Sequence, residues 1–511
     1  MSVNLRCVAL IALASLTISH EGARKALAEE ASSAVLQIAI ESSPAGLDPH
    51  IVTAFNSVVI VNGTIYEGLT AIDKDLRVTP GLAESWTVSP NGLRYRFKLR
   101  PGVTFHDGTP MTAEDVVASL RRVQAKEFAS PLASRLMAVS EVDAVDPLDV
   151  ELKLKEPSAP LLAALAGIAV VPHAMETDKE TLQKKPIGTG PFKFEAWQPN
   201  GFILLARNPH YREADKPKLA GLKFNIVPEA ATRAIGLTTS QYALLPQLDA
   251  ATALELKDKP GIKLTQTLEL SDTVIGLNAS RAPFDHERVR EAVNYALDRQ
   301  AIIDAALFGA GVPAGPLSPV LKGWARPVAD FPCYRHDPQK ARTLLQEAGF
   351  TKGTKLVLRV LASRQDIKDI AQVVQAELAV VGIDVELANE ETGQFVQDWR
   401  NGNFDLFASA NAGGADPDEF LYRAFHTGGS TNVFKYSDAT VDRDLDEARR
   451  LSDSAERKAI YDRLQAKLAC SGPIVAIAYG TLFSAARAEL KGYEIMANRS
   501  LVSLRDASLS P

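Results

Sequence analysis

The residues that could carry out chemistry are scattered along the chain and complete no reaction motif. Gly188-Thr189-Gly190 begins like a phosphate-binding loop, but Pro191 and Phe192 follow it, so no helix can present its backbone N–H groups to a phosphate. His286-Glu287 begins like a zinc-hydrolase motif, but position 290 is arginine and supplies no second imidazole. The chain has no Gly-x-Ser-x-Gly and no Ser-x-x-Lys segment. We therefore expect no catalytic residue, no metal site, no cofactor and no enzymatic activity.

An apolar stretch close to the N-terminus predicts export. Arg6 precedes the stretch, which extends from Cys7 to Ile18 and is too short to span a bilayer. Ala26-Leu27-Ala28 then supplies the small residues that signal peptidase accepts. Residues 1–28 are predicted to form a signal peptide, and the mature protein to lie in a Gram-negative periplasm. Because Cys7 precedes the apolar stretch, it is not placed to become a lipid-modified N-terminus.

The composition excludes several classes of protein. The chain has 511 residues, a net charge of −6, 46% hydrophobic and 23% charged residues, which is typical of a globular protein with two or three structural units. A mildly acidic chain has no large basic surface for a phosphate backbone, so we expect no nucleic-acid partner. Cys333 and Cys470 would remain after export, and they could form a disulfide or stay as buried thiols.

The elements that would position functional residues belong to a mixed α/β pattern. Val35–Ile40 reads as a short buried strand, and the turn-rich loop Glu41–Gly46 follows it, which is a usual place for a ligand contact. Val357–Leu361 and Val385–Leu387 read as strands on either side of a helix that ends at Gly382. This β-α-β unit predicts a sheet with helices on its faces.

Further boundaries follow from capping residues. Thr112 with Asp115 three residues later predicts the start of a helix. One long helix is expected from Glu287 to Leu307, and Asp453 is expected to cap a helix over residues 455–468. Thr273–Asn278 reads as a strand.

Long segments of the chain resemble a known family. They include LDPH at 47–50, IYEGL at 65–69, the run from Pro80 to Leu120, GTGPF at 188–192, RNPHY at 207–211, the run from Gly276 to Ile303, the run from Tyr334 to Phe350, ADPDEF at 415–420 and FHTGGSTN at 425–432. This pattern is similar to that of the extracytoplasmic solute-binding proteins that serve peptide and nickel ABC importers, and it covers practically the whole mature chain.

The resemblance implies an α/β fold of two lobes, the large class of periplasmic binding protein, with the ligand cleft between the lobes. Residues 29–270 and 481–511 would form the first lobe, with an extra subdomain at about 80–190, and residues 271–480 would form the second. The implied function is that of a monomeric binding component that captures a peptide, a peptide-like or an acidic small solute and delivers it to an ABC permease. A receptor that feeds a chemosensor would have the same fold, and a secreted hydrolase is the alternative of a different class.

The resemblance also implies which residues line the cleft. One loop would contribute Ser42, Ser43 and Pro44, and the strand and loop before ADPDEF would contribute Ser409, Asn411, Ala412 and Gly413. Peptide-binding members carry an aspartate in the second loop that holds the peptide's α-amino group, but this chain has no acid between Ser409 and Ala415. Either the amine anchor is missing, or a shift of the alignment makes Asp416 or Asp418 the anchor.

Arg364 is the expected anion anchor. It falls in the loop where dipeptide-binding members place an arginine for the peptide carboxylate, and a guanidinium suits bidentate recognition of a carboxylate. A solvated loop arginine is the alternative. An anion receptor without an ammonium receptor favours an acidic solute that needs no free amine, and Gly413→Asp is expected to improve the binding of free peptides.

Overall fold

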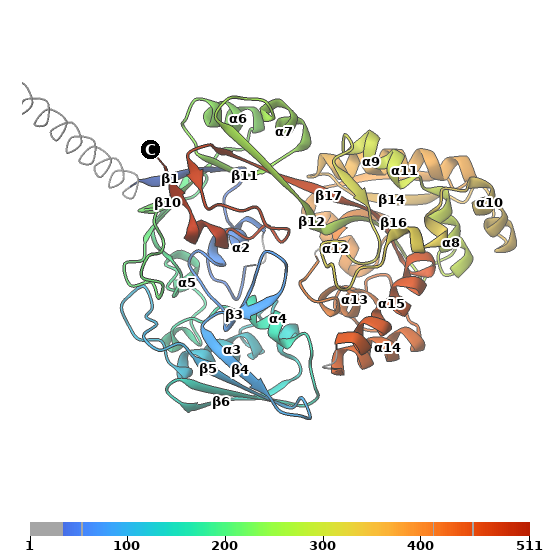
Figure 1. Cartoon of the computed structure of the whole chain (residues 1–511). Coiled ribbons are helices and arrows are strands. Elements are labelled where there is room, and N and C mark those ends of the chain that lie inside the picture. The colour runs from blue at the N-terminus through green and yellow to red at the C-terminus, as the bar shows by residue number, and fades with distance from the viewer. Residues whose placement is uncertain (1–33, 53–54, 412, 452–453, 511) are drawn as a thin grey trace, which may run out of the picture.

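Two lobes share one continuous β-sheet in the computed structural model, which describes residues 34–52, 55–411, 413–451 and 454–510 (Figure 1). Within these ranges eleven strands form the sheet in the order β15-β14-β16-β12-β17-β11-β1-β10-β9-β8, with β13 paired to β17. Two long antiparallel strands, β12 (Ile262–Leu277) and β17 (Ile474–Arg487), run from one lobe into the other. We call the part before β12 and after β17 the first lobe, and the part between them the second lobe. The predicted signal peptide, residues 1–28, lies outside the described residues.

In the first lobe, helices and a small subdomain surround the sheet. β1 (Val35–Ile40) forms as predicted and pairs in parallel with β10 (Gly221–Ile226). The other elements of this lobe outside the subdomain are α2 (Phe55–Val61), β2 (Thr70–Ile72), β3 (Val78–Pro80), α4 (Leu161–Ala166), η2 (His173–Met175), α5 (Thr181–Lys184), β8 (Phe192–Gln198), β9 (Phe202–Arg207), α6 (Ala230–Thr238), β11 (Leu244–Leu248), α7 (Ala250–Leu256), β18 (Leu490–Lys491), η5 (Val502–Asp506) and β19 (Ser508–Leu509).

The subdomain is a separate antiparallel sheet in the order β4-β5-β7-β6, covered by α3 (Ala113–Gln124). The helix begins after Thr112 as predicted, because Asp115 Oδ2 accepts a hydrogen bond of 2.7 Å from the backbone N–H of Thr112. The other elements of the subdomain are β4 (Ala83–Val88), β5 (Arg94–Leu99), η1 (Ala133–Leu136), β6 (Val139–Asp146) and β7 (Asp149–Leu154).

The second lobe confirms the β-α-β prediction. β14 (Leu356–Leu361) and β15 (Val385–Glu390) are parallel, and α11 (Gln365–Val381) connects them and ends at Gly382, whose φ of 92° is the left-handed conformation that glycine favours. The lobe also contains α8 (Glu287–Ala296), α9 (Arg299–Ala306), β13 (Gly311–Pro313), η3 (Val328–Asp330), η4 (Pro332–Tyr334), α10 (Pro338–Glu347), α12 (Thr392–Asn401), β16 (Leu406–Asn411), α13 (Asp418–Phe425), α14 (Ala439–Arg450) and α15 (Ser454–Ser471).

Two predicted elements differ from the structure. The single helix expected over residues 287–307 is two helices, because Leu297 is extended and Asp298 caps a new helix by accepting a hydrogen bond of 3.0 Å from Ala301 N–H. The strand expected from Thr273 begins eleven residues earlier, at Ile262, because it is the end of β12. Asp453, the expected cap of α15, lies outside the described residues.

The two cysteines left open by the sequence form a disulfide. Cys333 in η4 and Cys470 in α15 are joined, with 5.6 Å between their Cα atoms. The bond ties the last long helix of the second lobe to the segment that precedes α10. Within the described ranges, no helix is long and apolar enough to cross a bilayer.

Candidate functional site

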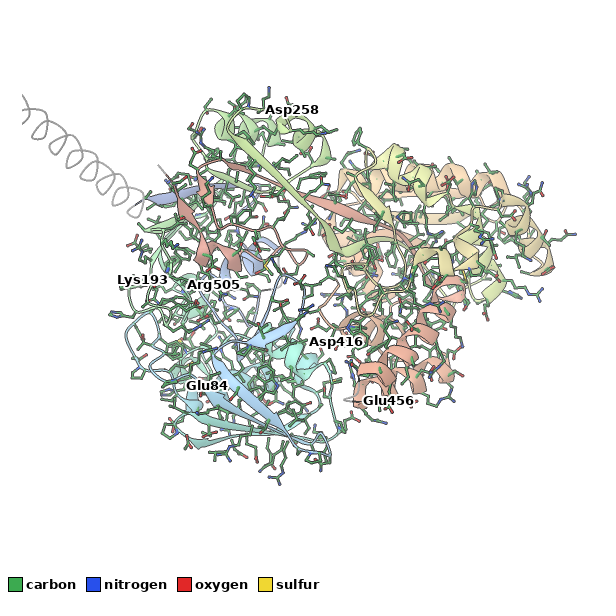
Figure 2. All side chains as sticks on the ribbon, viewed as in Figure 1. Glu84, Lys193, Asp258, Asp416, Glu456 and Arg505 are labelled. Carbon is green, nitrogen blue, oxygen red and sulfur yellow. A yellow bond between two sulfur atoms is a disulfide. The ribbon has the colours of Figure 1, made fainter. Side chains whose placement is uncertain are left out.

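A cavity of about 250 Å³ lies between the two lobes, beside the strands that connect them. The first lobe contributes charged and aromatic side chains to it, and the second lobe contributes a glycine-rich loop. Figure 2 labels Arg505, from the first lobe's side, and Asp416, which lies where the second lobe faces the first. The side chains and loop residues that matter below are Tyr66, Glu67, Arg135, Arg212, Gly413, Gly414 and Glu419.

The lobes touch each other on both sides of this cavity. Leu76, at the tip of the β2–β3 hairpin, is 7% exposed and packs into an apolar cluster of the second lobe. On the other side, Ala159 N–H donates a hydrogen bond of 2.9 Å to the carbonyl of Arg449, and Arg450 pairs with Glu156 at 2.9 Å. The cavity therefore has walls from both lobes.

Glu67 organises the wall of the first lobe. Its carboxylate accepts hydrogen bonds from Arg212 Nη2 at 2.9 Å, the Tyr211 hydroxyl at 3.1 Å and Thr189 Oγ1 at 3.1 Å. These residues come from IYEGL, RNPHY with the residue after it, and GTGPF, three segments that carried the sequence resemblance. Because Glu67 and Arg212 satisfy each other, they form a fixed part of the wall.

The glycines of GTGPF have a steric role. A Cβ at Gly188 would lie 2.1 Å from the carbonyl oxygen of Ile65, and a Cβ at Gly190 would lie 2.5 Å from that of Thr64. The segment that resembled a phosphate-binding loop therefore packs against the backbone beside Glu67, which explains why it needs glycine there.

The acids of ADPDEF are already paired. Asp416 makes hydrogen bonds of 2.8 and 3.0 Å to the guanidinium of Arg457, and Asp418 makes bonds of 2.7 and 3.1 Å to that of Arg449. Burial acts to lower the pKa of Arg457, but Asp416 outweighs it and the pKa is raised. Both acids hold the loop against α14 and α15, so the geometry does not support the alternative in which one of them anchors a ligand amine.

Ser42, Ser43 and Pro44, the predicted residues of the loop after β1, are not among the residues that line the large cavity. Ser42 is exposed and its hydroxyl accepts a hydrogen bond from Asn56, Ser43 Oγ accepts one of 3.4 Å from Asn200 N–H, and Pro44 is buried. Glu41 and Asn56 line a smaller cavity of about 40 Å³ that shares Val59 and Ser500 with the large one.

The predicted residues of the second lobe come closer to the cavity. Ser409 and Asn411 lie on β16 opposite Val274 and Asp272 of β12, Ala412 lies outside the described residues, and Gly413 lines the cavity. A Cβ at Gly413 would lie 2.4 Å from the carbonyl oxygen of Leu270. An aspartate there would displace β12, so the geometry contradicts the expectation that Gly413→Asp creates an amine anchor.

Arg364 is not an unpaired cation. Its Nε and Nη2 donate to the two carboxylate oxygens of Asp366 at 2.8 and 2.5 Å, and its side chain is 42% exposed. The Asp366 carboxylate raises the pKa of Arg364, and Glu269 and Glu41 act in the same direction. A ligand carboxylate would have to compete with Asp366 for this guanidinium.

Two residues that the sequence interpretation missed face the space between the lobes. Arg135, on η1, lines the cavity and makes no ion pair or side-chain hydrogen bond with any described residue. Its positive charge acts to lower the pKa of Glu419, which belongs to the second lobe, although burial outweighs this effect. Asp272 is a buried acid on β12. Its position directly before the apolar run TVIGL at 273–277 was a signal available in the sequence, whereas nothing in the sequence marked Arg135.

A two-lobed α/β protein with two crossing strands and a cavity between its lobes has the architecture of a periplasmic binding protein. The model of the family described as "Bacterial extracellular solute-binding proteins, family 5 Middle" matches residues 77–432. The chain belongs to this family, and its relatives are substrate-binding proteins of ABC importers.

Relatives extend the similarity to almost the whole chain. The glutathione-binding protein GsiB of Pectobacterium atrosepticum is 30% identical over 489 residues, 93% of this chain and 94% of that protein. The solved structure of DppA from Helicobacter pylori in complex with the peptide STSA has a TM-score of 0.81 and 28% identity, covering 94% of this chain and 98% of that one. That of AgaA from A. tumefaciens R10 in complex with agropinic acid has a TM-score of 0.82 and 26% identity, covering 93% and 99%.

Proposed function

We propose that this chain is an exported periplasmic receptor that captures a small peptide-like solute with an acidic group and delivers it to the membrane subunits of an ABC importer. The observation that carries the proposal is the cavity between the lobes, whose wall includes the guanidinium of Arg135, a cation that forms no ion pair with any described residue. The relatives support it, because one is a glutathione-binding protein, one is in complex with a peptide and one with agropinic acid.

Arg135 is better placed than Arg364 to hold the acid. A guanidinium that binds a carboxylate through two parallel hydrogen bonds gives both energy and orientation. Arg364 already makes this arrangement with Asp366, whereas Arg135 forms no ion pair with a described carboxylate and lines the cavity. The charge of Arg135 acts on Glu419 of the second lobe, so a carboxylate held by Arg135 would lie where the lobes face each other.

Closure of the lobes would couple capture to delivery. β12 and β17 are the connections between the lobes within the described residues, and their pairing is irregular between Leu268 and Asp272 and again between Thr273 and Val274. Such irregularities bend a strand locally, which suits a hinge. Closure buries the solute and brings together the surfaces of both lobes that a permease would contact. In this proposal the receptor is a monomer. It carries out no catalytic step, needs no cofactor and binds no nucleic acid.

The proposal is tested by purifying the protein from the periplasm of a Gram-negative host that expresses it with its own N-terminus. Mass spectrometry of the released solute should detect a peptide-like acid, and the scattering radius of the emptied protein should fall when that solute is added back. Protein confined to the cytosol, or a radius that does not change at saturation, would contradict the proposal.

Arg135→Ala is expected to weaken binding of this solute by about 10-fold or more, because a charge-assisted pair is lost. Arg364→Ala, the matched comparison, is expected to weaken it less, since Asp366 already compensates that charge. Isothermal titration calorimetry of both variants measures the difference. If Arg364→Ala weakened binding more than Arg135→Ala, Arg364 rather than Arg135 would be the residue that holds the solute acid.

A further inference from the structure

The carboxyl group of Asp272 is buried where the two lobes meet and has no partner for one of its oxygens. The residue is 5% exposed, and Oδ2 accepts no hydrogen bond from any described group. No lysine or arginine of the described chain forms an ion pair with it. Leaving an acid in this condition costs stability, so a partner absent from the polypeptide is expected.

Asp272 lines a small chamber that adjoins the large cavity. The chamber has a volume of about 10 Å³, enough for one group of the size of water. Its walls include Leu270, Gly413 and Gly414, which also line the large cavity. A solute bound between the lobes could therefore extend one small group past these residues to Asp272.

The polarity of the chamber selects a hydrogen-bond donor with positive charge. The other carboxylate in its wall, Asp416, is neutralised by Arg457. Glu269, on the same strand, is paired with Arg499, and the remaining titratable groups that act with Asp272 are the phenols of Tyr334 and Tyr479.

We propose that Asp272 is the receptor for an ammonium group of the solute, supplied by the hinge strand rather than by the loop before Asp416. This inference rests on the proposed function and narrows the solute class to small peptide-like molecules with both a carboxylate and a primary amine. An ammonium has the size and donors that the chamber accepts, and it converts an unpaired acid into a charge-assisted pair.

The protonation state of the acid agrees with this role. Burial raises the pKa of Asp272 to about 8, and Glu269 acts in the same direction. In the empty protein at neutral pH the carboxyl group therefore keeps its proton for most of the time. When the ammonium enters, the carboxyl ionises and its proton leaves to solvent, so binding at pH 7 releases close to one proton.

The test uses calorimetry with two matched pairs of probes, glutathione with N-acetylglutathione and alanyl-glutamate with N-acetyl-alanyl-glutamate. The wild type should bind at least one free amine about 10-fold or more tightly than its acetylated partner. Asp272→Asn, which keeps the shape of the side chain, should remove the preference. Asp444→Asn is the matched control, because Asp444 is 7% exposed on α14 and lies outside the cavities described above.

Each pattern of results has a distinct meaning. Acetylated probes that bind as tightly as free ones, or a preference retained in Asp272→Asn, would overturn the role of Asp272 and leave the proposed function standing. Failure of all four probes to bind would overturn both. If Asp272→Asn does not fold, wild-type titrations in two buffers of different ionisation enthalpy still decide, since absence of proton release with a free amine would contradict the proposal.

Discussion

At the scale of single residues, buried ionisable groups divide into those that hold the fold and those left for a ligand. Arg122 and Asp48 are both fully buried, and the guanidinium donates to the carboxylate at 2.6 and 3.0 Å and to His50 Nδ1 at 3.0 Å. The LDPH segment thus anchors the end of the loop after β1 to α3. Asp272 has no such complement, and this contrast separates a structural ion pair from a candidate binding group.

Asp48→Ala is expected to lower the free energy of unfolding by about 3 to 5 kcal/mol, because it leaves the guanidinium of Arg122 buried without its partner. Glu141→Ala is the control, since Glu141 is 59% exposed and its pair with Lys153 lies at the surface, and a change within about 1 kcal/mol is expected. Urea denaturation monitored by circular dichroism measures both. Equal small losses would show that the buried network is not needed for stability.

Asp272→Asn is expected to stabilise the empty protein at alkaline pH. Because the folded-state pKa of Asp272 is raised to about 8, the unfolded chain gives up its proton near pH 4 while the folded protein keeps it. The contribution of this protonated carboxyl group to the free energy of unfolding is therefore fully present below about pH 4 and is lost as the pH rises towards 8. The variant has no such proton, so its advantage should grow between pH 5 and pH 8, to about 2 to 5 kcal/mol.

Thermal or urea unfolding of dialysed wild type and Asp272→Asn at several pH values measures this difference. A difference between the two proteins that does not depend on pH would contradict the buried, protonated state of Asp272. The histidines His50 and His106, whose pKa values burial lowers to about 4, change stability equally in both proteins and cancel in the comparison.

At the scale of elements, local patterns predicted what local physics decides. Thr112 and Asp115 predicted the start of α3, and Gly382 predicted the end of α11, because caps act within one turn. The full length of β12 was not predictable in the same way. Its first residues, Ile262 to Thr265, alternate apolar and polar side chains like an edge segment, and two further polar residues follow them. Only pairing with β17, more than two hundred positions away in the chain, makes this segment a central strand.

The site was less predictable than the fold for the same reason. The sequence pointed to the loop around Gly413, and that residue does line the cavity. It could not show that Asp416 is paired with Arg457, that Arg364 is held by Asp366, or that the register places Asp272 beside Asn411. These are contacts between distant segments or between particular rotamers, and a pattern of residue types does not encode them.

Gly188→Ala is expected to destabilise the first lobe by about 1 to 3 kcal/mol, because its Cβ would overlap the carbonyl of Ile65 and the backbone beside Glu67 must move. Gly323→Ala is the matched control, since a Cβ at that exposed position meets no atom within 4 Å. Differential scanning fluorimetry compares the two. An unchanged melting temperature in Gly188→Ala would remove the steric explanation of the GTGPF segment.

At the scale of the whole molecule, the lobes interact through the hinge and through contacts that span the cavity. The disulfide between Cys333 and Cys470 lies entirely within the second lobe, so it supports that lobe as a body without restricting the hinge. The predicted boundaries at residues 270 and 480 fall inside β12 and β17 and stay predictions, because a shared sheet has no gap at which to divide it.

The β2–β3 hairpin is the contact across the cavity whose loss is expected to matter most for closure. Leu76 belongs to the same buried apolar cluster as Leu317 and Leu321 of the second lobe and Leu270 of β12, and burying a leucine contributes about 1.5 to 3 kcal/mol. The neighbouring pair between Asp75 and Lys322, at 4.0 Å and exposed, contributes little. The hairpin therefore stabilises the arrangement in which the lobes meet.

Leu76→Asp is expected to shift the protein towards an open arrangement, because a carboxylate cannot enter the apolar cluster without a large desolvation cost. The scattering radius should rise, and solute affinity should fall about 10-fold or more, since less of the protein occupies the state that binds. Asp75→Ala, one residue away, should change neither quantity. Because Leu76 sits at a hairpin tip and makes no contact with the core of its own lobe in the clusters described, the melting temperature of the first lobe should stay close to that of the wild type. A compact Leu76→Asp protein with normal affinity would show that the connecting strands and the remaining contacts between the lobes hold them together without the hairpin.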